Sequence, residues 1–150
     1  MKRAALLTFT LFLLAIIHSS CKDDIYIDWK LANERWYAQH KSDPGFITTK
    51  SGLCYKVIHQ GYQRHPDLNS QILVRYTGTL IDGTVFESDT AKLYLAQTIK
   101  GWQEGIQKMQ DGGNYIFYIP SALAYDTATT NANIPPYSVL RFDVELLESR

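Results

Sequence analysis

The chain has 150 residues, of which 45% are hydrophobic and 13% aromatic, enough for one domain with its own core and short attachments. Its 15 basic and 15 acidic residues give a formal net charge of +0 at pH 7. A neutral chain without a basic stripe argues against nucleic acid as a partner.

The first twenty residues have the pattern of a targeting segment. Lys2 and Arg3 precede an apolar run from Ala4 to Ile17, and small residues follow before Cys21. A positive start, an apolar stretch of about 7–15 residues and small residues before a cut describe a secretory signal. The run is shorter than the roughly 20 residues of a membrane-spanning helix. We therefore leave residues 1–20 out of the fold.

Cys21 stands at the expected cleavage site. This leader resembles a bacterial lipoprotein signal, in which Cys21 would become the acylated first residue and anchor the chain to the outer membrane, on its periplasmic or outer side. His18 departs from that pattern, because such signals usually carry an apolar residue there. Lys22-Asp23-Asp24 resembles a short tag that sends some Bacteroidota lipoproteins to the cell surface. The alternative is an ordinary secreted protein in which Cys21 pairs with Cys54.

A helix is expected to follow a short tether. Residues 21–27 are assigned to the tether, and Asp28 is the expected N-cap of a helix that continues to His40. The turn-forming sequence Ser42–Gly45 ends it. We expect its apolar face to pack against the following domain, with a dimer interface as the alternative. The residues of that face, at helical spacing, are Trp29, Ala32, Trp36 and Tyr37.

From Thr49 the hydrophobic pattern changes to a period of two, which predicts strands. Asp82-Gly83 is a hairpin-turn signal between two of them. The strands predicted in this half of the chain cover Leu53–Ile58, Ile72–Thr77, a return strand that begins at Val85-Phe86, and a short strand at Lys92–Ala96.

A short amphipathic helix interrupts the strands at Gly101–Met109, where Trp102, Ile106 and Met109 form one stripe. Asp111-Gly112-Gly113 stops this helix. Several antiparallel strands with one helix before the last pair predict an α+β fold, in which a curved sheet wraps around the helix. The last two strands are predicted at Tyr115–Ile119 and Leu140–Leu146, with a polar loop at Ser121–Pro136 between them.

Five motifs in the second half of the chain place aromatic residues beside glycine, proline or turn residues. They are VRYTGTLIDGTVFES (74–88), IKGW (99–102), LAYD (123–126), NIPP (133–136) and RFDVELL (141–147). In this order and spacing they resemble the FKBP family of peptidyl-prolyl cis–trans isomerases, from about Thr49 to Glu148. The resemblance implies an FKBP-like isomerase domain over residues 49–150, after a lipoprotein signal peptide over 1–20 and a tether with an N-terminal helix over 21–48.

The same resemblance implies which residues form the site. Trp102 would be the floor on which a proline ring rests. The Tyr125 hydroxyl and the Ile99 backbone N–H would donate to substrate carbonyls, and Ile134 would stand on a loop at the rim. The implied catalytic residues are Tyr76, Phe86, Glu87, Trp102, Tyr125 and Phe142, and the implied substrate-binding residues are Thr98, Ile99 and Ile134.

Some positions depart from the family pattern. Glu87 stands where the family usually has Asp, and Asp126 where it usually has Gly. Thr98 and Asn133 replace apolar residues, and Ala91 replaces a bulkier one. These changes predict a more polar and shallower rim.

The expected chemistry needs neither a metal nor a cofactor. Aromatic residues on strands usually belong to the core, but here they occur together with Gly78, Gly101 and Ile134-Pro135-Pro136, which favours a pocket. Such a pocket suits a ligand that is held and desolvated, as in the rotation of an X–Pro bond. The implied partners are proline-containing polypeptides and macrolides of the rapamycin type. The alternative is a catalytically weak FKBP-like chaperone or peptide-binding module.

Overall fold

The computed structural model describes residues 24–62, 64–128 and 133–150. Six strands form one sheet in the order β1-β2-β5-β6-β3-β4, and every neighbouring pair is antiparallel. They are β1 Phe46–Thr48, β2 Cys54–His59, β3 Gln71–Thr79, β4 Val85–Tyr94, β5 Asn114–Ile119 and β6 Leu140–Ser149. The predicted antiparallel α+β fold is confirmed.

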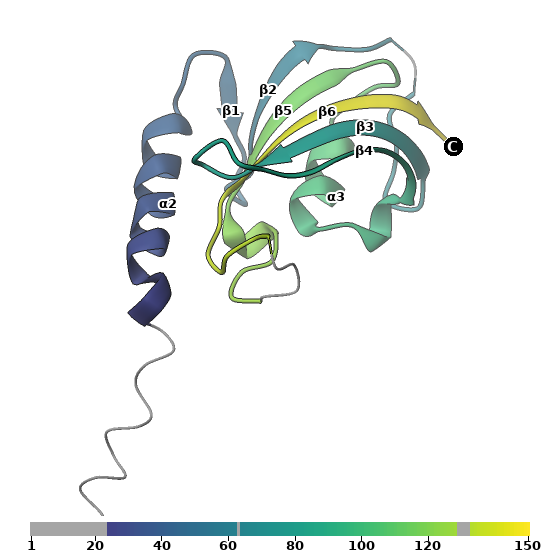
Figure 1. Ribbon diagram of the computed structural model, residues 1–150. Helices are drawn as coiled ribbons and strands as arrows, with labels where there is room; N and C mark the ends of the chain where they lie inside the picture. The colour runs from purple at the N-terminus through teal and green to yellow at the C-terminus, as the bar shows by residue number, and fades with distance from the viewer. Residues whose placement is uncertain (1–23, 63, 129–132) are drawn as a thin grey trace, which may run out of the picture.

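The sheet curves around the short helix α3, Lys100–Ile106, which lies in its concavity (Figure 1). The longer helix α2, Ile27–His40, lies outside that concavity. The described residues also form three 3-10 helices, η2 Asp24–Tyr26, η3 Leu95–Gln97 and η4 Ser121–Leu123.

The core fills the space between α3 and the concave face of the sheet. Strand pairing sets Tyr76 of β3 opposite Val144 of β6, and Phe117 of β5 opposite Phe142 of β6. Because successive residues of a strand point to opposite faces, these side chains share the concave face, while Tyr118 points to the convex one. Side chains of α3 and of the turn after it complete the core: Trp102 is 4% exposed, and Ile106 and Met109 are fully buried.

Helix α2 begins earlier than predicted. Its N-cap is Tyr26, and Asp28 lies in the first turn and makes no capping hydrogen bond, so the predicted cap was wrong. Residues 24–26, expected to be tether, form η2. A carboxylate in the first turn still favours the helix through its dipole.

Helix α2 packs on the domain as expected, through Trp29, Trp36 and Tyr37 of the predicted face but not through Ala32. Ala32 is exposed, whereas its neighbour Asn33 is 1% exposed and bonds the domain's backbone. Trp36 meets Tyr118 of β5 edge-on at 4.9 Å between ring centroids, on the convex face. The helix therefore combines aromatic and polar contacts.

Two boundaries inside the domain differ from the predicted ones. The separate strands expected from Val85-Phe86 and at Lys92–Ala96 are one strand, β4, because β3 pairs with it from Gln71↔Tyr94 to Thr79↔Val85. This strand ends at Tyr94, and Leu95 and Ala96 lie in η3 instead. Pairing along the whole of β3 overrides the polar stretch that breaks the hydrophobic alternation. Helix α3 ends at Ile106, and the Met109 N–H bonds the Ile106 carbonyl in a tighter turn. The chain thus leaves the helix while Met109 still reaches the core.

The sheet also starts earlier than the predicted boundary at Thr49. Strand β1 pairs with β2 through Phe46↔Lys56 to Thr48↔Cys54. Three residues are too few to show a reliable period of two, which is why the pattern missed this strand.

Candidate functional site

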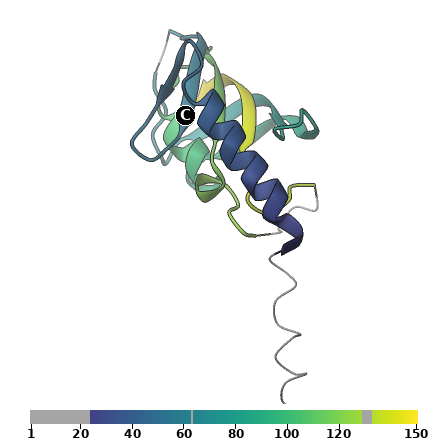
Figure 2. The same cartoon turned by 90° about the vertical axis from the view of Figure 1, so that its left-hand side faces the viewer.

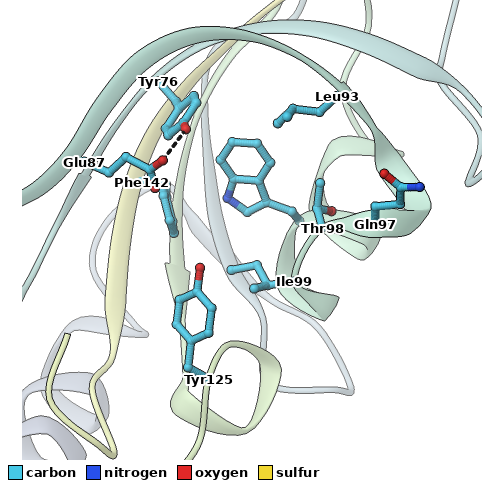
Figure 3. Close-up of a pocket in the computed structure, with 9 residues that line it drawn as sticks. Tyr76, Glu87, Leu93, Gln97, Thr98, Ile99, Tyr125 and Phe142 are labelled. Carbon is cyan, nitrogen blue, oxygen red and sulfur yellow. Dashed lines mark hydrogen bonds between the residues drawn. The ribbon is translucent and has the colours of Figure 1, made fainter. Parts of the chain in front are cut away.

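A cavity of about 360 Å³ opens between β4, the start of α3 and the loop after β5 (Figure 3). This volume lies within the range typical of small-ligand pockets, and most of the lining is apolar. The lining residues are Tyr76, Glu87, Leu93, Gln97, Thr98, Ile99, Trp102, Tyr125 and Phe142. They include seven of the nine residues that the family resemblance implied.

Three aromatic rings form the inner wall by meeting edge to face. The Tyr76 and Trp102 ring centroids are 4.9 Å apart at 90°, and those of Trp102 and Phe142 are 5.2 Å apart at 77°. In an edge-to-face pair the positive edge of one ring meets the negative face of the other, and part of the ring surface stays uncovered. The wall is thereby rigid, and it offers π surface to a ligand.

Two glycines allow the wall to form. A Cβ at Gly78 would lie 2.4 Å from Cζ of Phe86 and 2.8 Å from Cε1 of Phe142. A Cβ at Gly101 would lie 2.4 Å from Cγ2 of Ile119, on the strand beneath the helix. These glycines let the rings and helix α3 approach the sheet backbone closely.

Helix α3 brings Trp102 and Ile99 to the floor and edge of the cavity. Ile99 is its N-cap, and the Ile99 carbonyl accepts from the N–H groups of Trp102 and Gln103. The Ile99 N–H donates no hydrogen bond within the described residues. The buried Nε1 of Trp102 has no partner in that part of the chain either. Both N–H groups are thus left without an acceptor among these residues.

A hydrogen bond joins the one carboxylate of the lining to the aromatic wall. The Tyr76 hydroxyl donates to Oε1 of Glu87 over 2.8 Å (Figure 3). Burial and this bond raise the pKa of Tyr76 well above its usual value. Glu87 itself is exposed at the mouth, so water solvates the rest of its carboxylate. The charge stays at the edge of the cavity.

The Tyr125 hydroxyl points into the cavity from the side opposite Tyr76 and Glu87 (Figure 3). Its ring is half-buried. Burial, and to a smaller extent the charge of Glu87, raises the pKa of Tyr125. The hydroxyl therefore keeps its proton at neutral pH. The next residue, Asp126, has a φ of +50°, a left-handed conformation that suits glycine best. This explains why glycine is usual at that position in the family that the motifs resemble.

Phe86 and Ile134 are the two predicted site residues that do not line the cavity. Phe86 is half-buried and meets Phe142 edge-on at 5.5 Å, so it supports the wall from behind. Ile134 is 4% exposed and belongs to the hydrophobic core instead of standing at the rim. The lining in turn includes Leu93 and Gln97, which the sequence did not single out. Leu93 could have been found from the alternation of β4, because it lies on the same face of the strand as Glu87 and Ala91.

Other predicted features have no counterpart that the structure can test. Residues 1–20, Cys21 and the tag at 22–24 fall outside the described residues, apart from the backbone of Asp24. Within the described ranges, no three or more His, Cys, Asp or Glu side chains gather as they would around a metal. In the same ranges, none of the helices has the length and apolarity to cross a bilayer.

The motifs and the fold have clear relatives. A family model described as FKBP-type peptidyl-prolyl cis-trans isomerase matches residues 62–147. The chain is 40% identical over 124 residues to a probable FKBP-type peptidyl-prolyl cis-trans isomerase FkpA of Neisseria meningitidis, covering 79% of this chain and 46% of that protein. It is 40% identical over 119 residues to the FKBP-type 22 kDa peptidyl-prolyl cis-trans isomerase of Escherichia coli, covering 76% and 58%. The chain thus spans about half the length of these relatives.

Solved structures agree with this likeness. The crystal structure of FkpA from Escherichia coli superposes with a TM-score of 0.81 at 30% identity, covering 99% of this chain and 71% of that one. A peptidyl-prolyl cis-trans isomerase from Pseudomonas syringae gives a TM-score of 0.77 at 29% identity, covering 83% and 95%. The family predicted from the five motifs is confirmed.

Proposed function

This chain belongs to the family of FKBP-type peptidyl-prolyl cis-trans isomerases, and on that premise we propose that it isomerises X–Pro bonds in exported polypeptides during their folding. The observation that carries the proposal is the aromatic cavity of about 360 Å³, with a tyrosine hydroxyl and a backbone N–H at its edge. Proline-containing polypeptides are the substrate class. Macrolides of the rapamycin type are a second ligand class for the same apolar walls.

The chemistry follows from the electronic structure of the amide. Rotation about the bond meets a barrier of about 18–20 kcal/mol, because twisting breaks the resonance that makes the amide planar. The planar amide is the more polar of the two forms, so water stabilises it more than it stabilises the twisted transition state. Moving the bond into the aromatic cavity removes that advantage and lowers the barrier. No acid, base or nucleophile takes part.

In this proposal each lining residue has a distinct role. The indole of Trp102 supports the proline ring, with Tyr76 and Phe142 as walls. The Ile99 N–H and the Tyr125 hydroxyl donate to carbonyls on either side of the rotating bond, which fixes the chain while the bond turns. The Ile99 N–H is free for this role among the described residues, and the raised pKa of Tyr125 keeps its hydroxyl a donor.

A binding module without catalysis is the second candidate. The observation that favours it is the Glu87 carboxylate, which lines the cavity beside Tyr76. A charge close to the amide keeps it solvated and planar, which opposes rotation. Such a module would hold an extended chain and would not speed its isomerisation.

Exchange NMR on short X–Pro peptides separates the two candidates. The full chain, in detergent, should raise the cis-to-trans exchange rate well above that in buffer. If exchange is no faster than in buffer at high protein concentration and peptide binding is still detected, the enzyme is excluded and the binding module is supported. If neither faster exchange nor peptide binding is detected, the proposed site is refuted.

We also propose that Cys21 is acylated and anchors the protein to a membrane, after removal of residues 1–20. Cys54 supports this indirectly: it is a fully buried free thiol within the described residues, so it is poorly placed to pair with Cys21. A relative in Legionella longbeachae is named an outer membrane protein. Cys21→Ser should give an unprocessed or soluble protein, and unchanged detergent partitioning of that variant would refute the anchor.

A further inference from the structure

Helix α2 contacts a loop segment that has no role in the mechanism proposed above. The segment Pro135–Val139 leads from the loop after η4 into β6. Figure 2, turned by 90°, shows α2 crossing in front of the domain with this segment beside its N-terminal half. Figure 1 shows the same neighbourhood from the side.

Two side chains of α2 bond this segment directly. The buried Val139 N–H donates to Oδ1 of Asn33 over 2.8 Å, and the Asn33 amide donates to the Trp29 carbonyl over 2.8 Å, which fixes its orientation. Trp29 Nε1 donates to the Ser138 hydroxyl over 3.0 Å, and that hydroxyl donates to the Pro135 carbonyl over 2.6 Å. Asn33 is 1% exposed and Ser138 3% exposed, so water cannot easily replace either bond.

The segment in turn holds the turn that carries Tyr125. The Tyr137 N–H donates to the Asp126 carbonyl over 2.7 Å. Both residues adopt left-handed backbone conformations, with φ of +63° for Tyr137 and +50° for Asp126. Non-glycine residues keep such conformations only where the surroundings hold them. The Lys30 ammonium adds a contact, 4.9 Å from the centroid of the Tyr137 ring.

From this chain of contacts we infer that Trp29 and Asn33 are positioning residues for the isomerase site: they hold Pro135–Val139, which holds the Asp126 turn and so sets the Tyr125 hydroxyl over the cavity. The N-terminal helix is then a working part of the site, although it lies outside the segment that the family model matches. The inference rests on the proposed function. It requires that a small shift of Tyr125 lower the rate, as misplacement of a reacting group commonly does.

The chain offers a matched pair of substitutions for the test. Trp29→Phe removes the indole N–H that bonds Ser138, and Trp36→Phe makes the same chemical change on the same helix, where the ring contacts Tyr118 and His40. Both tryptophans are half-buried. The expected result in the full chain is a fall in kcat/KM of about three- to tenfold for Trp29→Phe, and of less than twofold for Trp36→Phe.

Three further readouts separate positioning from general loss of stability. Amide exchange at Tyr137 and Val139 should quicken in Trp29→Phe and remain unchanged in Trp36→Phe. The loss in kcat/KM should fall mainly on kcat, because Trp29 does not touch the bound peptide. Ser138→Ala should lower the rate at least as much as Trp29→Phe, because it also removes the bond to the Pro135 carbonyl, and the double variant should be no worse than Ser138→Ala alone.

The outcomes are distinct from those for the proposed function. A wild-type chain without exchange activity refutes the enzyme, and the inference is then judged on whether the two tryptophan variants differ in amide exchange at Tyr137 and in peptide affinity. Equal behaviour of Trp29→Phe and Trp36→Phe in every readout would overturn the inference. Additive losses in the Ser138→Ala double variant would do the same.

Discussion

Two aromatic clusters lie on opposite faces of the sheet, and the one on the concave face lines the cavity. On the concave face, Tyr76, Trp102 and Phe142 meet edge to face around about 360 Å³ of open space. On the convex face, Phe46 stacks on Tyr118 at 4.3 Å and 17°. Trp36 of α2 covers that stack edge-on.

The difference shows that aromatic content alone does not mark a site. On the convex face the Phe46 and Tyr118 rings stack, so each ring covers one face of the other. Edge-to-face rings beside glycine leave ring faces open, and the Trp102 indole N–H stays buried without a partner among the described residues. The function therefore depends on the void and not on the number of rings.

The strongest test removes one tryptophan from each cluster. Trp102→Ala should cost about 3–5 kcal/mol of unfolding free energy and weaken peptide binding by about tenfold or more, because it removes a large buried surface from both the core and the floor. Trp36→Ala should cost less stability and leave peptide affinity unchanged. Chemical denaturation and peptide titration measure the two effects. Equal losses of affinity would show that the clusters do not differ in function.

The next largest effect concerns the glycine that admits the concave wall. Gly78→Ala should destabilise the protein by about 1–3 kcal/mol and slow isomerisation, since the new methyl would force Phe86 and Phe142 away from the strand. Gly83→Ala is the matched control: it has a φ of +86° but nothing within 4 Å of the added Cβ. That change should cost about 1 kcal/mol and leave the rate unaltered. Loss of rate in both would show that the effect does not depend on the close approach of Phe86 and Phe142.

The hydroxyl groups of Tyr125 and Tyr118 provide a third comparison. Tyr125→Phe should lower kcat about three- to tenfold with little change in peptide affinity, because it removes one donor and keeps the ring. Tyr118→Phe, on the convex face, should leave both constants unchanged. Exchange NMR gives the rates and a peptide titration the affinity. A fall in affinity alone would assign Tyr125 to ground-state binding.

A smaller effect is expected at Glu87. Glu87→Asp should raise the exchange rate about two- to threefold, since a shorter side chain draws the charge away from the amide. Glu87→Gln keeps the length and removes the charge, so it should raise the rate at least as much. Stability should hardly change, because the side chain is exposed. If neither variant is faster, the bond to Tyr76 already keeps the carboxylate out of the way.

The smallest effect is expected from pH. Burial raises the pKa values of Tyr76 and Tyr125 above the unfolded value of about 10, so both hydroxyls keep their protons and the exchange rate should not change between about pH 7 and 9. Above about pH 10 the unfolded chain ionises these groups more readily than the folded one, so stability should fall as the pH rises. A rate that falls by half below pH 9 would contradict the protonated-donor role of Tyr125.

The sequence by itself determined the local elements and the family. Period-two patterns located β3, β5 and β6, and a stripe of three apolar residues located α3. Side chains point to the same side at a fixed spacing along a strand or a helix, so the pattern of apolar residues shows the element. The five motifs contain the residues that line the cavity apart from Leu93, Gln97 and Thr98, and the family resemblance also implied Thr98. The sequence was sufficient for features that depend only on neighbouring residues.

Only the tertiary structure decided how distant segments meet. Strand β4 is continuous because β3 pairs with all of it, although its own sequence is polar in the middle. Ile134 is 4% exposed and lies in the core and not at the rim. Asn33 binds a backbone N–H 106 residues away in the chain. No local period carries information about a contact of that separation, so the docking of α2 against the loop could be seen only in the folded molecule.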